Sequence, residues 1–548
     1  MKSIFIFRLL SDMGVPFLFY NYYKKFNKSN DLMIDFVTLN QIDINSIFFD
    51  FNSLIHPAAQ QILSANYNIY IKIDNLDERN FIMERDIIQN VINYTRVIIN
   101  KTNVKNIYII IDGIAPRSKM IQQRERRYKS EFFKVESAEK SSLWDSNKIT
   151  PGTVFMDKLN KSLIHFKNNT DLNVFISDSN EPGEGEHKMM KIISNKLNIN
   201  SEQKILLYGL DADLIFISML NPMSDSIILI RDNTFNNTLT EDKRTLDYVD
   251  ISNLKNYIYT DLVNTLKLKS NFNFVKNNLI QDYVFICFLL GNDFLHNLPN
   301  MSIKSGGIET LIKAYSNSWK DSYLINNEAV YNDSQVNHIN LVFLKDIFYQ
   351  LKNHEIYFFK NFRIESLANS EINTLKQLEL TDRISFYKED ILKLNKSNYK
   401  ERYYLYYGIK KSEIKDNCIN YLQGLSWIFG YYNGHSHNNW SWYYKHHNVP
   451  FCSDLFEFLR TESDINLNIT QDKPVSNIKQ LCLVLPKKSL LTILKENNII
   501  NEKLNVFINS YSKYYPDNIY VDLINKRYLW QSKIFFENID ETILDLFL

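Results

Sequence analysis

The chain has 548 residues, 45% of them apolar and 14% aromatic, which predicts more than one packed domain and excludes an intrinsically disordered protein. Its formal net charge of +1 means that any surface for nucleic acid has to be local rather than a general excess of positive charge. The four cysteines show no CxxC spacing, and no apolar run approaches the roughly 18 residues of a membrane helix, which argues against a zinc site, a disulfide framework and membrane insertion.

The N-terminal segment MKSIFIFRLLSDMGVP contains an apolar stretch that faintly resembles a signal peptide. Arg8 and Asp12 interrupt this stretch, and no small-residue cleavage site follows it. We therefore expect residues 1–12 to be a short extension and the first domain to begin at Met13.

Short apolar runs in the first half of the chain are followed by acidic residues. SIFFDFN, NIYIIIDG, NVFISD and KILLYGLDAD resemble buried strands, and helical patterns lie between or beside them at 86–101, 156–167 and 188–197. This alternation predicts an α/β fold with a mostly parallel central sheet flanked by helices. In such a sheet the functional crevice lies beyond the carboxyl ends of the strands. The acidic residues expected there are Asp50, Asp112, Glu184, Glu186, Asp211 and Asp213.

The later part of the chain is mainly helical in pattern. The apolar run in DYVFICFLLGND leads through a Gly-Asn turn to Asp293, and a dense aromatic block, GLSWIFGYYNGHSHNNWSWYYKHHNVPF, follows further on. We expect a catalytic region at residues 13–318 and a connecting, mainly helical segment at 319–402. A second region at 403–548 should pack against the first and complete a substrate channel.

Seven acids are thus expected to meet in one crevice. So many carboxylates repel one another unless cations neutralise them, and hard divalent ions such as Mg²⁺ or Mn²⁺ prefer oxygen ligands. A pair of such ions can hydrolyse a phosphodiester bond. A single acid at a strand end is more often a turn former, so the prediction depends on the whole set. Five of the 13 glycines lie within two residues of these acids, where tight turns are expected.

A basic segment, GIAPRSKMIQQRERRYKS, directly follows the second of these acids. Its spacing puts three cations and one amide on the same face of a helix, where they could hold a phosphate group. A solvated basic face is the alternative, but the position after a carboxylate-bearing strand favours phosphate binding. The four residues of this stripe are Lys119, Gln123, Arg126 and Arg127.

Three ring side chains are candidates for stacking on nucleotide bases. His56 follows the first strand-like run, and Trp440 and Trp442 belong to the segment NWSWYYKHH. Taken singly, each is more typical of a structural residue. Stacking of bases on such rings is nevertheless common in proteins that bind single-stranded nucleic acid.

In this order, the motifs resemble the signature blocks of the eukaryotic 5'→3' exoribonucleases, the XRN family. The matching blocks are MGVP, FFDFNSLIHP, IDGIAPRSKMIQQRERR, ITPGT, EPGEGEHK, LYGLDADLI, FLLGNDFLHNLP, GLSWIFGYY and SWYYKHHNVPF. The resemblance implies a PIN/flap-nuclease-like catalytic domain that processively hydrolyses single-stranded RNA bearing a 5'-monophosphate. It implies two Mg²⁺ ions, or Mn²⁺, and nucleoside 5'-monophosphates as products.

By position, the resemblance also implies roles for the candidate residues. The seven acids match the metal-binding and catalytic acids of the family, and the basic stripe matches its 5'-phosphate pocket. His56 matches the histidine that stacks on the first base, and either Trp440 or Trp442 matches its stacking partner.

Several features depart from the family pattern. Ser53 stands where the first block usually has glycine, and the segment between Arg127 and Ile149 is shorter than the helical insertion of many relatives. Because the chain ends soon after the matched blocks, we expect it to lack the long C-terminal partner-binding modules of the large cytoplasmic form. We also expect a monomer. The lack of a basic import run favours a cytoplasmic enzyme of RNA degradation or mRNA decay, with a nuclear or viral compartment left open.

Two other functions remain alternatives. A structure-specific 5' nuclease acting on DNA flaps would share the carboxylates but lack the WSWYY block. A catalytically inactive scaffold that binds RNA 5' ends would not need every expected acid, and all seven are present.

Overall fold

The computed structural model describes most of the chain. The described residues are 22, 33–34, 39, 41–102, 104–136, 143–197, 202–232, 246–267, 272–301, 303, 306–325, 339–368, 392–434, 439–499, 501–517, 519, 521–522, 533–535 and 537–548. The predicted extension at residues 1–12 and the MGVP block lie outside them, so the expectation about the N-terminus stays a prediction.

A seven-stranded sheet lies at the centre of the first region, in the order β1-β7-β6-β5-β2-β3-β4. The five strands from β6 to β4 run parallel, whereas β7 is antiparallel to β6 and β1 is antiparallel to β7. The mostly parallel sheet expected from the sequence is therefore confirmed. The strands are β1 (Met33–Ile34), β2 (Ile44–Asp50), β3 (Asn106–Ile110), β4 (Asn173–Ser177), β5 (Lys204–Tyr208), β6 (Ile227–Asp232) and β7 (Leu246–Asp250).

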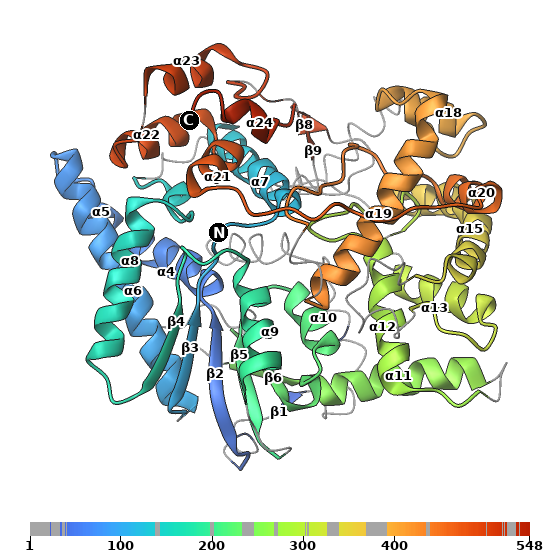
Figure 1. Ribbon diagram of the computed structural model, residues 1–548, viewed down its shortest axis with the longest axis horizontal. Coiled ribbons are helices and arrows are strands. Elements are labelled where there is room, and N and C mark those ends of the chain that lie inside the picture. The colour runs from blue at the N-terminus through green and yellow to red at the C-terminus, as the bar shows by residue number, and fades with distance from the viewer. Residues whose placement is uncertain are drawn as a thin grey trace.

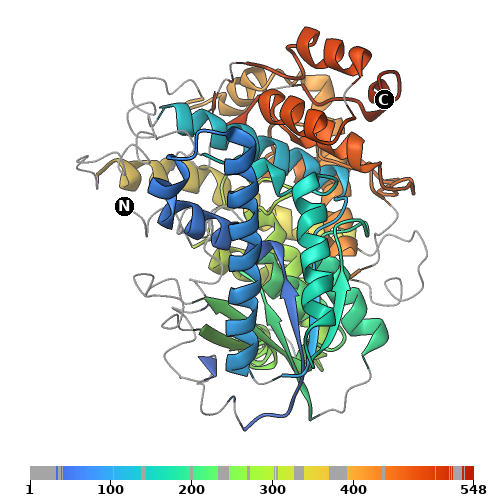
Figure 2. The same ribbon diagram turned by 90° about the vertical axis from the view of Figure 1, so that its left-hand side faces the viewer.

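Helices cover both faces of this sheet. Successive residues of a strand point to opposite faces, so the apolar strands contribute side chains to two cores, one on each face. In β2, Ile47 and Phe49 enter one hydrophobic core, and Phe48 enters the other. The first core is closed by α4 (Asn52–Ala65), α6 (Leu76–Thr102) and α8 (Val154–Asn168), with the short α5 (Tyr67–Tyr70) between α4 and α6. The second is closed by α9 (Gly185–Lys196), α10 (Asp213–Leu220), α11 (Ile251–Lys267) and α12 (Lys276–Cys287). Figures 1 and 2 show these layers.

The second region is mainly helical and packs against the first, as expected. The core on the α9 side is a single hydrophobic cluster that contains residues from β2 and from positions as late as Leu467. It thus extends across the predicted domain boundaries at 318/319 and 402/403, and these boundaries stay predictions. The helices that extend it, on the right of Figure 1, are α13 (Gly307–Ser318), α15 (Leu341–Ala368), α19 (Ile414–Tyr432) and α20 (Cys452–Thr461). A smaller cluster around Tyr403 and Phe451 joins α18 (Tyr399–Tyr406) to Phe359 of α15.

One helix of the first region, α7 (Arg117–Glu136), is enclosed by the C-terminal part of the chain. Its start, with Ile114, Ala115 and Met120, forms a separate core with the C-terminal helices. These helices, at the top of Figure 1, are α21 (Asn477–Val484), α22 (Lys487–Glu496), α23 (Glu502–Ser510) and α24 (Glu541–Leu544). A short strand pair, β8 (Val521–Asp522) and β9 (Lys533–Ile534), lies beside α7.

Two expectations from composition can be compared with the fold. All four cysteines are buried and free, consistent with the expected absence of a disulfide framework. Across the described residues, no helix is both long and apolar enough to cross a membrane.

Candidate active site

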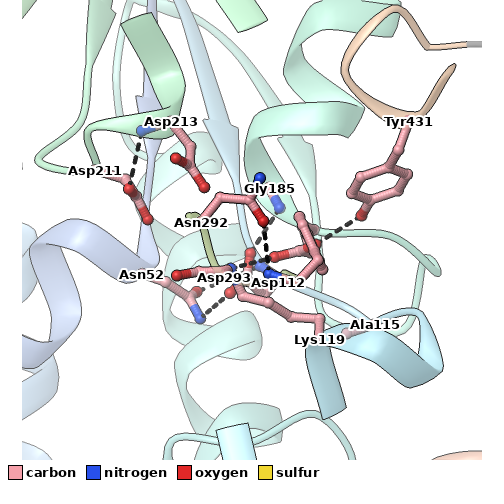
Figure 3. A network of polar contacts seen from close by, with 12 residues as sticks. Asn52, Asp112, Ala115, Lys119, Gly185, Asp211, Asp213, Asn292, Asp293 and Tyr431 are labelled. Atoms are coloured by element: carbon pink, nitrogen blue, oxygen red, sulfur yellow. Dashed lines mark hydrogen bonds and ion pairs between the residues drawn. The ribbon is translucent and has the colours of Figure 1, made fainter. Parts of the chain in front are cut away.

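The predicted acids lie at the carboxyl edge of the sheet. β2 ends at Asp50, while Asp112 lies two residues beyond β3 and Asp211 three residues beyond β5. Because these strands are neighbours in the order β5-β2-β3, their ends meet at one place. The other four acids come from the first turns of α9 and α10 and from the loop after the turn Phe288–Leu290; they are Glu184, Glu186, Asp213 and Asp293. Glu184 and Glu186 interact electrostatically with Asp112, Asp211 and Asp50, and Figure 3 shows Asp213 and Asp293 beside Asp211 and Asp112.

Two glycines of the EPGEGEHK motif shape this crevice in different ways. Gly183 has a positive φ of 115°, which a glycine adopts most readily. Its amide donates to the carbonyl of Ile114 at 2.8 Å, and its own carbonyl accepts from Gly113 at 2.9 Å. Gly185 lies where space is limited, since a Cβ atom there would lie 3.2 Å from the Oδ1 atoms of both Asp50 and Asp112, closer than ordinary van der Waals contact. Its amide donates to Asp112 Oδ1 at 2.6 Å, so the start of α9 is held against the carboxylates.

Lys119 lies among the carboxylates rather than beside the arginines of its helix. Its Nζ atom is 2.7 Å from Glu184 Oε2 and 2.7 Å from Asp293 Oδ2, and the side chain is buried. Burial alone would lower the pKa of Lys119, but Asp293, Glu184 and other nearby carboxylates raise it well above the ordinary lysine value. Lys119 is therefore charged and neutralises part of the acidic cluster.

The carboxylates raise one another's pKa. Burial, followed by the charge of Asp112, raises the pKa of Asp50 to about 7. Burial and the charge of Asp211 raise the pKa of Glu186 well above its ordinary value. Burial is also the largest cause of the raised pKa values of Glu184, Asp211 and Asp213. The raised pKa values of these acids show that burial and mutual repulsion outweigh the effect of nearby cations, which include Lys119 and Arg231.

The donor set is suitable for a hard divalent cation. It consists of carboxylate oxygens, the ligands that Mg²⁺ and Mn²⁺ prefer. Asp213 Oδ1 is buried and has no hydrogen-bond partner within the described residues. As the side chains stand, no three His, Cys, Asp or Glu residues in the described part of the chain form a ready cation site.

Two polar residues that follow Asp50 also hold the acids, although the sequence did not single them out for this role. Asn52 Nδ2 donates to Asp112 Oδ2 at 2.8 Å, and Ser53 Oγ donates to Asp50. Ser53 Oγ also accepts from the amide of Leu210 at 3.3 Å, so the hydroxyl links the ends of β2 and β5. For Ser53 the FFDFNS motif was the available signal, because a side chain three residues after Asp50 at a helix start lies close to it. No local signal indicates the contact between Asn52 and Asp112, which are 60 residues apart.

Other contacts to the acids come from distant parts of the chain. The Tyr431 hydroxyl, at the end of α19, donates to Glu184 Oε1 at 2.7 Å. The adjacent Tyr432 lies close enough to Asp213 to lower its pKa, against the larger effect of burial. Arg231 on β6 donates to two backbone carbonyls of the turn between β5 and α10. No local pattern in the sequence indicates these partners.

A second group of predicted residues gathers further along α7. Burial, and then the charges of Arg126 and Arg127, lower the pKa of His56 to about 3, which places the imidazole near both guanidinium groups. Arg127 Nη1 donates to Thr150 Oγ1 at 2.7 Å and to Asn147 Oδ1 at 3.2 Å. The predicted basic stripe therefore falls into two parts. Lys119 lies among the carboxylates, whereas Arg126, seven residues or about 10 Å further along the helix axis, lies near His56. Gln123 lies between them and is partly buried.

The two candidate tryptophans differ in their surroundings. Trp442 is 8% exposed and stacks on Trp427 of α19, with ring centroids 5.0 Å apart. Trp440 is only partly buried, and its backbone carbonyl accepts from the amide of Arg117, the first residue of α7, at 2.7 Å. Trp442 is thus a core residue, whereas Trp440 lies at the start of the helix that carries both groups of candidate residues.

The sheet, its acidic crevice and the helical second region define a PIN-like α/β catalytic domain. The family description "XRN 5'-3' exonuclease N-terminus" matches residues 13–233, and "Xrn1 helical domain" matches residues 272–382 and 360–546. The chain therefore belongs to the XRN family.

Individual relatives agree with this assignment. The chain is 26% identical over 599 aligned residues to human 5'-3' exoribonuclease 1, an alignment that covers 96% of this chain and 34% of the human protein. It is 25% identical to 5'-3' exoribonuclease 2 of Yarrowia lipolytica, with 90% of this chain and 63% of that protein covered. Against the Saccharomyces cerevisiae 5'-3' exoribonuclease 1, 24% identity extends over 96% of this chain and 42% of the yeast protein. The chain thus spans less than two thirds of the length of each of these relatives.

Proposed function

We propose that the chain is a processive 5'→3' exoribonuclease that hydrolyses single-stranded RNA carrying a 5'-monophosphate. The observation that carries this proposal is the arrangement of α7. Its first turn contributes Lys119 to the acidic crevice, and two turns later it carries Arg126 and Arg127 next to His56. Two arginines and a histidine ring close to a cluster of acids suit a strand whose terminal phosphate is bound while the next phosphodiester is cut.

The residues near Arg127 would recognise the end of the strand. Thr150 and Asn147 hold the Arg127 guanidinium, so its planar fork is oriented in advance for a phosphate. Because its pKa is about 3, the His56 imidazole is neutral at physiological pH and offers an uncharged ring to the first base. Trp440 is the better candidate for the opposite side of that base, since Trp442 is engaged in the core. A capped or triphosphate end would have to place extra groups within this confined pocket.

The acidic crevice would carry out hydrolysis. The residues that would hold divalent cations are Asp50, Asp112, Glu184, Glu186, Asp211, Asp213 and Asp293. When bound by such carboxylates, a pair of Mg²⁺ ions activates an attacking water and stabilises the leaving oxygen. Lys119 and the amide of Gly185 keep Glu184, Asp293 and Asp112 directed into the crevice. The buried surroundings strengthen these electrostatic contacts by limiting solvent.

A digestion experiment tests the proposal. RNAs of one sequence with a 5'-monophosphate, 5'-triphosphate or 5'-hydroxyl, and the matching 5'-monophosphate DNA, are incubated with Mg²⁺ and the wild-type chain. We expect nucleoside 5'-monophosphates from the 5'-monophosphate RNA alone, and no products with EDTA or with the Asp211→Asn variant. Internal cuts in DNA flap substrates would support a structure-specific nuclease instead. Binding of the RNA without cleavage would support a scaffold.

Replacing Arg127 tests the pocket for the 5' end. Arg127→Ala removes a preoriented charged donor, and charge-assisted hydrogen bonds of this kind contribute enough for a roughly 10–100-fold effect. We expect the ratio of cleavage rates for 5'-monophosphate over 5'-hydroxyl RNA to fall by that factor. Lys129→Ala is the control, because Lys129 is on the same helix but pairs with Glu125 at 3.2 Å. An unchanged ratio in Arg127→Ala would contradict the assignment of the pocket.

A further inference from the structure

We propose that Tyr431, at the end of α19, is a positioning residue of the active site that orients the Glu184 carboxylate for cation binding. The proposal deepens the proposed function, because it rests on Glu184 being a cation ligand. It concerns the GLSWIFGYY segment, for which the sequence suggested no chemical role beyond forming part of the channel.

The first observation is how the Glu184 carboxylate is held. The Tyr431 hydroxyl donates to Oε1 at 2.7 Å, and Lys119 Nζ lies 2.7 Å from Oε2. The two oxygens are thus engaged by partners from opposite regions of the chain, Lys119 from the first and Tyr431 from the second (Figure 3). If a cation displaces Lys119 from Oε2, the hydroxyl of Tyr431 still fixes the direction of the carboxylate.

The second observation is that the Tyr431 ring cannot readily turn away. It is 3% exposed and stacks on Trp427, with centroids 4.8 Å apart and an interplanar angle of 13°. The ring of His187 lies 3.7 Å away on α9, and Phe294 meets it edge-on at 5.6 Å. A ring contacted by three others keeps its hydroxyl in one place.

The same stack reaches the segment that contains the candidate base-stacking residue. Trp427 stacks on Trp442 at 5.0 Å, and its Nε1 donates to the carbonyl of Asn439 at 3.1 Å. Asn439 directly precedes Trp440. One aromatic stack on α19 therefore supports both Glu184 and the backbone around Trp440.

These contacts predict a specific effect on cation binding. Hydrogen bonds to a metal-binding carboxylate orient it and reduce the rearrangement that binding requires. Loss of such a partner typically weakens metal binding or activity by about 10–100-fold. Tyr431→Phe removes only the hydroxyl and leaves the ring to fill the same space among its three neighbours.

The experiment measures Mn²⁺ binding to the full chain without RNA, by electron paramagnetic resonance of the free ion. We expect Tyr431→Phe to weaken Mn²⁺ binding by roughly 10–100-fold, with a far-ultraviolet circular dichroism spectrum like that of the wild type. Tyr421→Phe is the matched control, since Tyr421 is fully buried on the same helix and its hydroxyl has no hydrogen-bond partner within the described residues. We expect Tyr421→Phe to bind Mn²⁺ as the wild type does.

A second comparison keeps the test decisive if Tyr431→Phe changes stability. In a Glu184→Gln background, adding Tyr431→Phe should weaken Mn²⁺ binding no further, because the hydroxyl acts through Glu184. Full additivity, or wild-type affinity in Tyr431→Phe, would overturn the proposal, as would a wild-type chain that binds no Mn²⁺. If Tyr431→Phe weakens Mn²⁺ binding but the wild type releases no nucleotides from RNA, the proposed function fails and the positioning role stands.

Discussion

At the scale of single residues, two tryptophans in the same short segment have different surroundings. Trp442 is packed on Trp427, and the indole Nε1 of Trp442 is buried without a hydrogen-bond partner in the described part of the chain. Trp440 is only partly buried, and its backbone is fixed by the amide of Arg117 and by Asp472. The first arrangement serves packing, and the second leaves part of an indole available to a ligand.

This difference predicts opposite effects of two substitutions. Trp442→Ala should lower the free energy of unfolding by about 3–5 kcal/mol, the usual cost of removing a buried aromatic ring. Trp440→Ala should instead weaken binding of 5'-monophosphate RNA by roughly 1–3 kcal/mol, the range for base stacking. Chemical denaturation and fluorescence anisotropy in EDTA measure the two effects. Weak RNA binding by a fully stable Trp442→Ala variant would reverse the assignment.

At the scale of elements, helix α7 combines structural and functional faces. Arg117 and Arg124 are buried and donate to backbone carbonyls of the C-terminal region, including those of Ile539 and Leu483. Elsewhere on the same helix, Lys119 pairs with Asp293 in the acidic cluster, and Arg127 donates to Thr150. The C-terminal helices therefore hold in place the helix that joins the two groups of site residues.

Arg124→Met tests the structural face of α7. The variant keeps much of the side-chain volume but leaves the carbonyls of Leu483 and Tyr514 without their donor. Charged hydrogen bonds contribute roughly 1.5–3 kcal/mol each, so we expect the free energy of unfolding to fall by about 2–5 kcal/mol. Guanidinium denaturation measures the change, with the partly exposed Lys129→Met as the control. Equal stability of the two variants would show that Arg124 does not hold the C-terminal helices.

At the scale of the whole molecule, the site is assembled from both regions, and its buried carboxylates repel one another. The sheet edge, α7 and the end of α19 all contribute to one buried acidic crevice. Burial raises the pKa of Asp50 to about 7, and it raises the pKa values of four further acids of the site. The folded chain therefore binds these protons more tightly than the unfolded chain does.

The sign of the pH dependence follows from this difference. A carboxyl group whose pKa is higher in the folded state stabilises the fold below its unfolded pKa, about 4. That contribution is lost as the pH rises through about 7. If the carboxylates bind Mg²⁺ as proposed, Mg²⁺ should reverse the loss, because a cation that binds the deprotonated acids of the folded chain alone stabilises the fold. We expect Mg²⁺ at about 100 times its dissociation constant to raise the melting temperature by several degrees at pH 8, and by much less at pH 5.

Differential scanning calorimetry measures these shifts. Asp211→Asn is the comparison variant, and its Mg²⁺-dependent shift at pH 8 should be smaller than that of the wild type. A shift of the same size at both pH values would contradict the pH argument. The absence of any shift would contradict cation binding by the crevice.

The sheet and the acids at its edge could be predicted from local patterns in the sequence. A period of two residues in β2 separates Phe48 from Ile47 and Phe49, and the carboxyl ends of parallel strands necessarily meet at one edge. The EPGEGEHK motif also indicated a tight turn, although it did not distinguish the backbone angle needed at Gly183 from the space needed at Gly185. These features depend on local periodicity and short turns, which a sequence displays directly.

The partners of the site residues, in contrast, depend on how distant parts of the chain pack together. Lys119 was grouped with Arg127 because both lie on one helical face, yet its ammonium is held by Glu184 and Asp293. Tyr431 meets Glu184 across a separation of 247 residues. Such contacts arise from how the helical region packs on the sheet. That packing is set by the complementary shapes and burial of many side chains together, so no local spacing encodes it.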